Sequence, residues 1–411
     1  MTFTETLDTS EAARGAPESP LAAAESEPRR RFTLDGDEQL EWQLERTCAR
    51  IVSGIRGLIP PRKLEAVILG GGYGRGEGGV LRGNAGDRPY NDMELYVAIK
   101  GSRHLNEIRY GRRLEVFGEI MAHLADAEVE FKVTSLSEMA AGPVSMFSYD
   151  LAAGHRVLWG GTSEDLLAGM DLHRCAENIP QSEATRLLMN RCSGLLFARA
   201  ELEKESLSPS AADFVRRNVA KAQLACGDAL LAAQGRYHWS CRERHRRLEH
   251  FVRERRSAWF NEALRLHALG VEFKLRPESG EVPRGLLAER HAEVSAFAQK
   301  CWLWLEARRL GRPFPTARSY AEAACDGCPG SSPILNVLLN LRADGFRPRA
   351  RPSPWRHPRQ RILRSLALLL WEPGAATDPA LRARIEGELN ARGSNPGDWV
   401  AAYKRLWSRV R

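Results

Sequence analysis

The chain has 411 residues, enough for two or three domains, and its 27% of charged residues is typical of a globular protein. The formal charge is +8, and the basic residues concentrate in 236–256 and 342–364 with acids interleaved, which favours charged helix surfaces over a nucleic-acid site. No apolar run reaches the roughly 18 residues of a membrane span, and the start lacks the pattern of a secretory signal. We therefore expect a cytoplasmic protein without a membrane partner.

The first thirty residues, 1–30, are rich in Glu, Ala, Ser, Thr and Pro, so we expect a disordered tail. Apolar residues then recur at helical spacing over 37–58, and Pro60 and Pro61 end this helix. The helix is expected to cover one face of a sheet.

The most informative stretch of the sequence is 66–100. The apolar run 66–69 predicts a buried strand that stops at three glycines, 70–72. A polar, glycine-rich segment follows, and 91–97 then predicts a second strand. The stretch therefore predicts two strands joined through a glycine turn.

Two acids on the second strand point to chemistry. Asp92 and Glu94 face the same side because strand side chains alternate. Such a pair is costly unless a cation lies between the carboxylates. A glycine turn opposite them suits metal-assisted phosphoryl transfer, because glycines let phosphates approach backbone N–H groups and carboxylates hold Mg²⁺.

A third acid on a later strand would complete a metal site. After a helix over 105–125, residues 127–134 alternate strictly between apolar and charged. Glu130, on the charged face of this strand, is the candidate, and Glu128 on the same face is the alternative.

The second half of the chain is mostly helical by pattern. A last short strand is expected over 155–161, and helices are expected over 182–200, 211–234, 241–269, 283–310, 334–344, 358–371, 379–391 and 398–410. The class is therefore α+β. We expect a mixed-sheet domain over 31–175, a helical bundle over 180–310 and a helical C-terminal region over 311–411.

Cysteine usage adds one open question. The eight cysteines are scattered, and without a signal peptide they are expected to be reduced. Cys325 and Cys328 form a CxxC, but no second pair stands at zinc-finger spacing, so a loop with two small residues is favoured over a zinc site.

The sequence GGYGRGE at 71–77, followed by Asp92 and Glu94, resembles the signature of the nucleotidyltransferase superfamily with the DNA polymerase β-like fold. The form of the glycine motif is most similar to that of the bacterial nitrogen-regulatory uridylyltransferases. The resemblance covers 66–100 strongly and extends weakly to residue 161. It implies a transfer that uses two Mg²⁺ ions and moves a nucleoside monophosphate from a nucleoside triphosphate to a hydroxyl, with pyrophosphate leaving.

The resemblance also assigns roles to residues. It places Gly71 and Gly72 at the triphosphate and implies that Asp92, Glu94 and Glu130 bind metal, with Glu130 helping to activate the acceptor hydroxyl. Arg75, within the glycine motif, would contact phosphate or else form a salt bridge that shapes the loop.

The helical half is similar to the partner domains that close over small nucleotidyltransferase domains. The similarity implies nucleotide contacts from Lys221 and Tyr237, with Asp228 as a further contact. The acceptor is expected to be a small molecule or a protein in preference to RNA, and neither it nor the base of the nucleotide follows from the sequence.

Several positions depart from the family pattern. Residues 79–90 are an insertion, Asn91 replaces the usual serine, and glutamates stand at the second and third acid positions. Because a longer side chain shifts a metal ligand, the alternative is a protein of the same fold with weakened catalysis that acts as a nucleotide-binding regulator or scaffold.

Overall fold

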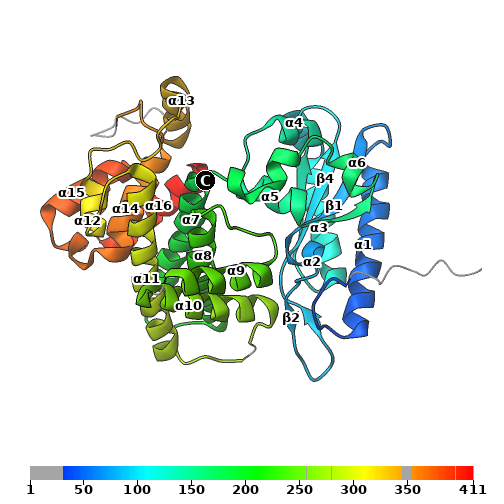
Figure 1. Ribbon diagram of the computed structural model, residues 1–411, viewed down its shortest axis with the longest axis horizontal. Helices are drawn as coiled ribbons and strands as arrows, with labels where there is room; N and C mark the ends of the chain where they lie inside the picture. The colour runs from blue at the N-terminus through cyan, green and yellow to red at the C-terminus, as the bar shows by residue number, and fades with distance from the viewer. Residues whose placement is uncertain (1–30, 256, 279, 345–352, 394, 411) are drawn as a thin grey trace, which may run out of the picture. The chain divides into compact units, whose positions relative to one another are not determined.

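The computed structural model describes five stretches of the chain, 31–255, 257–278, 280–344, 353–393 and 395–410. The first stretch contains a four-stranded sheet of order β5-β4-β1-β6 (Figure 1). Its strands are β1 (Leu64–Leu69), β4 (Met93–Ile99), β5 (Val129–Thr134) and β6 (Arg156–Trp159). β1 is antiparallel to both of its neighbours, whereas β4 and β5 are parallel, so the sheet is mixed.

Two long helices cover one face of the sheet. α1 (Glu38–Leu58) begins at Asp37, whose side chain accepts a hydrogen bond from the backbone N–H of Leu40. α3 (Arg103–Ala125) connects β4 to β5, as parallel neighbours require. Apolar side chains of both helices form one buried cluster with alternate residues of the strands, such as Val67.

Short helices cover the other face. They are α4 (Leu136–Ala141), α5 (Met146–Ala153) and α6 (Ser163–Leu166). Ile68 of β1 and Tyr96 of β4 belong to the buried cluster on this side. Because both faces are covered, residues 66–69 of β1 and 95–99 of β4 are continuously apolar.

The insertion predicted over 79–90 forms a small hairpin of β2 (Val80–Leu81) and β3 (Arg88–Pro89). The amide oxygen of Asn91 accepts a hydrogen bond of 2.8 Å from the backbone N–H of Gly79 and so closes the base of the hairpin. Asn91, which stands where the resemblance implies a serine, thus has a structural role.

The regular elements after α6 in the described residues are helices. They are α7 (Gln181–Leu202), α8 (Pro209–Ala232), α9 (Cys241–Arg255), α10 (Ala258–Leu275), α11 (Arg284–Leu310), α12 (Ala317–Glu322), α13 (Pro333–Asp344), α14 (Arg359–Trp371), α15 (Pro379–Leu389) and α16 (Pro396–Val410), with short 3₁₀ turns at Asp171–Arg174, Ala176–Asn178 and Pro373–Ala376.

The single helix predicted over 241–269 is wrong, because α9 and α10 are separate. Ser257 is extended, with φ −111° and ψ 134°, and stands at the start of α10. Phe251 of α9 and Phe260 of α10 then meet edge to face, with ring centroids 4.9 Å apart. The two helices therefore turn back on each other to bury aromatic surface, a tertiary contact that the periodicity of either helix does not encode.

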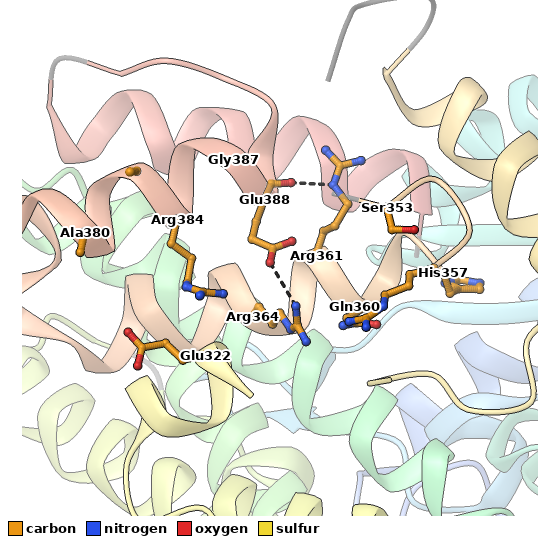
Figure 2. A pocket seen from close by; sticks show the side chains of 12 residues that line it. Glu322, Ser353, His357, Gln360, Arg361, Arg364, Ala380, Arg384, Gly387 and Glu388 are labelled. Atoms are coloured by element: carbon orange, nitrogen blue, oxygen red, sulfur yellow. Dashed lines mark hydrogen bonds and ion pairs between the residues drawn. The ribbon is translucent and has the colours of Figure 1, made fainter. Parts of the chain in front are cut away.

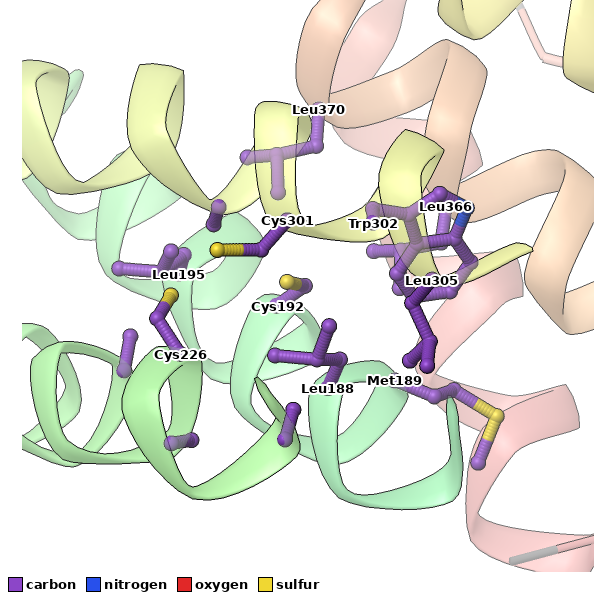
Figure 3. Packing of buried hydrophobic residues seen from close by; sticks show 14 of the residues in the cluster. Leu188, Met189, Cys192, Leu195, Cys226, Cys301, Trp302, Leu305, Leu366 and Leu370 are labelled. Atoms are coloured by element: carbon purple, nitrogen blue, oxygen red, sulfur yellow. The ribbon is translucent and has the colours of Figure 1, made fainter. Parts of the chain in front are cut away.

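Buried thiols belong to the helical core. Cys192 on α7, Cys226 on α8 and Cys301 on α11 lie among leucines and Trp302 (Figure 3). Burial raises the pKa of the Cys192 and Cys301 thiols well above the ordinary value, so they pack as small neutral groups. All eight cysteines are free, as expected.

The coarse prediction of an α+β chain, with a mixed sheet followed by helices, is confirmed. The tail expected over 1–30 lies outside the described residues. The chain from Phe32 onward forms one compact unit, and the finer domain boundaries at 175–180 and 310–311 stay predictions. Among the described helices we find none with the length and apolarity needed to cross a membrane.

A buried carboxylate ties three helices of the second half together. Glu306 of α11 is fully buried and accepts hydrogen bonds of 2.6 Å from the Thr185 hydroxyl and 2.8 Å from the Tyr320 hydroxyl. Arg309 forms an ion pair of 2.6 Å with the same carboxylate. The Glu306 carboxylate therefore connects α7, α11 and α12.

We expect Glu306→Gln to lower the free energy of unfolding by about 3–5 kcal/mol, because Arg309 would keep a buried charge without its counter-ion. Urea unfolding measures the loss. The matched control is Glu289→Gln, on the exposed side of α11, which should cost less than about 1 kcal/mol. Equal effects of the two substitutions would contradict the structural role of Glu306.

Candidate active site at the glycine motif and strands β4 and β5

The glycine motif follows β1 directly and forms α2 (Gly71–Arg75), a single short turn of helix. Gly71 has φ +61°, a conformation that favours glycine. A Cβ atom on Gly71 would lie 3.0 Å from the Oε1 atom of Glu94. The motif is therefore glycine-rich because its backbone lies directly against the carboxylate that the sequence predicts as a metal ligand.

The structure places the three predicted acids at β4 and β5. Asp92 is exposed just before β4, and Glu94 is the second residue of that strand. The parallel register pairs Glu94 with Glu130 of β5. Glu128, the alternative third acid, lies just before β5, where its carbonyl oxygen accepts a hydrogen bond from the backbone N–H of Met93. We call Asp92, Glu94 and Glu130 the carboxylate face.

Lys132 lies between two of these acids. Its Nζ atom is 3.2 Å from Oε2 of Glu94 and 2.9 Å from Oε2 of Glu130. The Tyr96 hydroxyl also donates a hydrogen bond of 2.8 Å to Glu94. Burial raises the pKa of Glu94, but Lys132 and Tyr96 outweigh it, so the pKa lies below the usual 4.5. The ammonium group thus offsets the repulsion between the two glutamates.

Asp92 and Glu94 carry the carboxylate oxygens that Mg²⁺ prefers. Lys132 holds both Glu94 and Glu130 in this structure, so a metal ion that bound either glutamate would have to displace the ammonium group. Across the described residues, three or more His, Cys, Asp or Glu side chains do not gather closely enough to hold a metal ion, and this includes the Cys325–Cys328 loop.

Three basic side chains from the helical half act on the same region. Arg191 of α7, Lys221 of α8 and Lys274 of α10 form no hydrogen bond or ion pair with the part of the chain that the structure describes. We call these three residues the cation cluster. Among the acids, Asp228 acts most strongly on Arg191, followed by Glu94 and Asp92, and Asp92 also acts on Lys221. These two cations are therefore electrostatically coupled to the carboxylate face, whereas the acid that acts on Lys274 is Glu77.

The cation cluster has perturbed ionisation. Loss of hydration, together with repulsion from Arg191, lowers the pKa of Lys221, although its side chain keeps access to solvent. Loss of hydration and repulsion from Arg75 likewise lower the pKa of Lys274. Closely spaced cations without counter-ions are a costly arrangement, and a polyanionic ligand would relieve the cost.

The predicted contacts Arg75 and Tyr237 have partners inside the protein. Nη1 of Arg75 lies 3.1 Å from Asp150, and the Tyr237 hydroxyl donates a hydrogen bond of 3.3 Å to the same carboxylate. The further candidate Asp228 is also buried, where it pairs with Arg244 at 2.6 Å. These three side chains hold the glycine motif, α5 and the helices α8 and α9 together.

The last residue of the motif makes the strongest connection to the helical half. Glu77 is buried, and its carboxylate accepts a hydrogen bond of 2.8 Å from the backbone N–H of Cys241, at the start of α9. Its other oxygen accepts one from the Ser240 hydroxyl. Burial raises the pKa of Glu77, but these hydrogen bonds outweigh it, so the pKa lies below its usual value.

Sequence reasoning had singled out Lys221 but missed Arg191, Lys274 and the role of Lys132. Alternation along 127–134 places Lys132 on the same face as Glu130. The pattern alone could therefore have predicted a counter-ion for this glutamate. Arg191 and Lys274 lie far from the glycine motif in sequence, and no local signal marks either of them.

We expect Lys132→Met to reduce stability at neutral pH. The pKa of Glu94 is depressed in the folded protein, so its contribution is present above the unfolded value of about 4.5 and is lost as the pH falls through the folded value. The variant should therefore be less stable than the wild type in urea at pH 7, and the difference should shrink at pH 3.

Lys100→Met is the matched control, because Lys100 is an exposed lysine directly after β4. This control should leave stability nearly unchanged at both pH values. A Lys132→Met variant with the same deficit at pH 7 and at pH 3 would show that the lysine does not act through ionised glutamates.

Comparisons of the chain with protein-family models, with curated proteins and with solved structures found no match.

Proposed function

We propose that the chain is a Mg²⁺-dependent nucleotidyltransferase with the polymerase β-like fold. It moves a nucleoside monophosphate from a nucleoside triphosphate to an acceptor hydroxyl and releases pyrophosphate. The observation that carries the proposal is the coupling of Asp92 and Glu94 to Arg191 and of Asp92 to Lys221, two cations whose side chains form no ion pair within the described chain. Acids for metal and cations for phosphates are the two halves of a site for a metal–triphosphate complex.

The residues have separate roles in the proposed transfer. Asp92 and Glu94 would hold the metal, which when bound neutralises phosphate oxygens and favours in-line displacement. Arg191, Lys221 and Lys274 bind the triphosphate, and their positive charge stabilises the pyrophosphate as it leaves. The glycine backbone at 71–72 allows the phosphates to approach closely.

The bond changes assign a task to Glu130. The acceptor oxygen bonds to the α-phosphorus, the bond from that phosphorus to the bridging oxygen of pyrophosphate breaks, and the Glu130 carboxylate takes the proton of the acceptor hydroxyl. Lys132 holds Glu94 and Glu130 in place before the substrates arrive. Arg75 and Tyr237 enter the proposal as positioning residues, because Asp150 binds both of them.

One observation favours the alternative of a nucleotide-binding regulator without catalysis. Lys132 already supplies a positive charge between Glu94 and Glu130, where the superfamily resemblance implies that both acids bind metal. A protein of this kind would bind the triphosphate through the cation cluster and leave it intact.

The substitution Asp92→Asn distinguishes catalytic transfer from nucleotide binding without catalysis. With α-labelled nucleoside triphosphates and a panel of hydroxyl acceptors, the wild type should transfer label, and the variant should lose transfer by at least about a hundredfold because a metal ligand is gone. Binding of the triphosphate without Mg²⁺ should persist in the variant. Glu119→Gln, an exposed acid on α3, is the control. A wild type that binds the triphosphate but never transfers label would favour the regulator.

The cation cluster is tested by binding. Lys221→Met and Arg191→Met should each weaken binding of a non-hydrolysable triphosphate by about tenfold or more, because each removes a charged contact with phosphate. Calorimetry at two salt concentrations measures the affinity and its dependence on charge. The exposed Lys63, changed to Met, is the control. Unchanged affinity in both cluster variants would overturn the assignment.

A further inference from the structure

A cavity lies in the C-terminal helices. It has a volume of about 620 Å³ and is lined by α14, α15, the end of α12 and the segment 353–357. Figure 2 shows the side chains of Arg364, Arg384 and Glu322, which come from three helices, around the same space. The volume is in the range of pockets that enclose a small organic ligand.

Two arginines of the cavity are neutralised and fixed. Arg361 is buried and forms an ion pair of 2.8 Å with Asp344, and its Nε atom donates to the carbonyl oxygen of Glu388. Arg364 pairs with the Glu388 carboxylate at 3.4 Å and donates to the carbonyl oxygen of Ala323. These contacts hold both arginines in place on one wall of the cavity. The charge of Glu388 is neutralised by Arg364.

Two further arginines form no ion pair within the described residues and can therefore bind an anionic ligand. Arg384 donates to the carbonyl oxygen of Ala321 at 3.3 Å, and Arg356 donates to that of Ala324 at 3.4 Å. Neither has a carboxylate within ion-pair distance among the residues that the structure describes. The remaining acid of the lining, Glu322, is engaged by Arg318 at 3.0 Å. The cavity therefore holds an excess of two positive charges.

The other walls set the character of the ligand. Ala380, Ala383 and Gly387 recur on one side of α15 and leave an apolar wall without long side chains. On the opposite side, Nδ1 of His357 accepts a hydrogen bond of 3.0 Å from the backbone N–H of Arg359, so a neutral ring carries its proton on Nε2. Burial lowers the pKa of His357 to about 4, so the ring is neutral at pH 7 and is a donor without charge.

We propose that this cavity is a second ligand site, which binds a phosphorylated small molecule of nucleotide size. The guanidinium groups of Arg356 and Arg384 bind the phosphate dianion, with Nε2 of His357 as a further donor. The body of the molecule lies against the alanine and glycine wall of α15. A dianion matches the two free charges, and guanidinium groups bind phosphate oxygens in pairs.

Binding to the full chain is measured by calorimetry with AMP, ribose 5-phosphate, inorganic phosphate and adenosine. At least one phosphate ester should bind about tenfold more tightly than inorganic phosphate, and adenosine should bind more weakly than AMP. Preference for AMP identifies a nucleotide as the ligand, and preference for ribose 5-phosphate identifies a sugar phosphate. Absence of ester binding, or equal binding of AMP and adenosine, overturns the proposal.

Variants locate the binding. Arg356→Gln combined with Arg384→Gln should weaken ester binding by at least about tenfold. Arg392→Gln, at an exposed arginine after α15, should leave ester binding unchanged. If Lys221→Met abolishes ester binding and the double variant does not, the ester binds at the cation cluster and the second site does not exist. Circular dichroism checks that each variant is folded.

Discussion

The buried carboxylate of Glu77 is the contact on which the geometry of the candidate active site depends. It belongs to the glycine motif of the sheet, yet its hydrogen bonds go to the start of α9 in the helical half. A buried carboxylate without such partners would be costly, so the contact fixes the two halves against each other. The glycine motif, which resembles a phosphate-binding turn, thus also connects the sheet to the helical half.

Much of the sheet was predictable because its signals are local. The continuous apolar run before the glycines and the strict alternation over 127–134 identify β1 and β5 without reference to the rest of the chain. The same alternation placed Glu130 and Lys132 on one face. The helices α1 and α3 followed from periodicity, and the proline pair after α1 gave its end. These elements obey rules that operate within about ten residues.

The remainder depends on contacts between distant segments. The meeting of Lys132 with Glu94 requires the parallel register of β4 and β5, which alternation along a single strand does not give. The break between α9 and α10 depends on an aromatic contact across the turn. Arg191 lies far along the chain from Glu94 and Asp92, whose charges act on it, and Lys274 lies far from Glu77. Arg75 and Tyr237 were predicted by motif and by analogy, and their shared partner Asp150 lay in a segment without any signal.

The unpaired cation cluster has a consequence for the life of the protein in the cell. Its mutual repulsion works against the folded state whenever no anion is bound. A bound polyanion would offset that repulsion and shift the equilibrium toward the folded chain. If the ligand is a nucleotide, occupancy of the site would then slow proteolysis of the chain, because it lowers the population of the unfolded form.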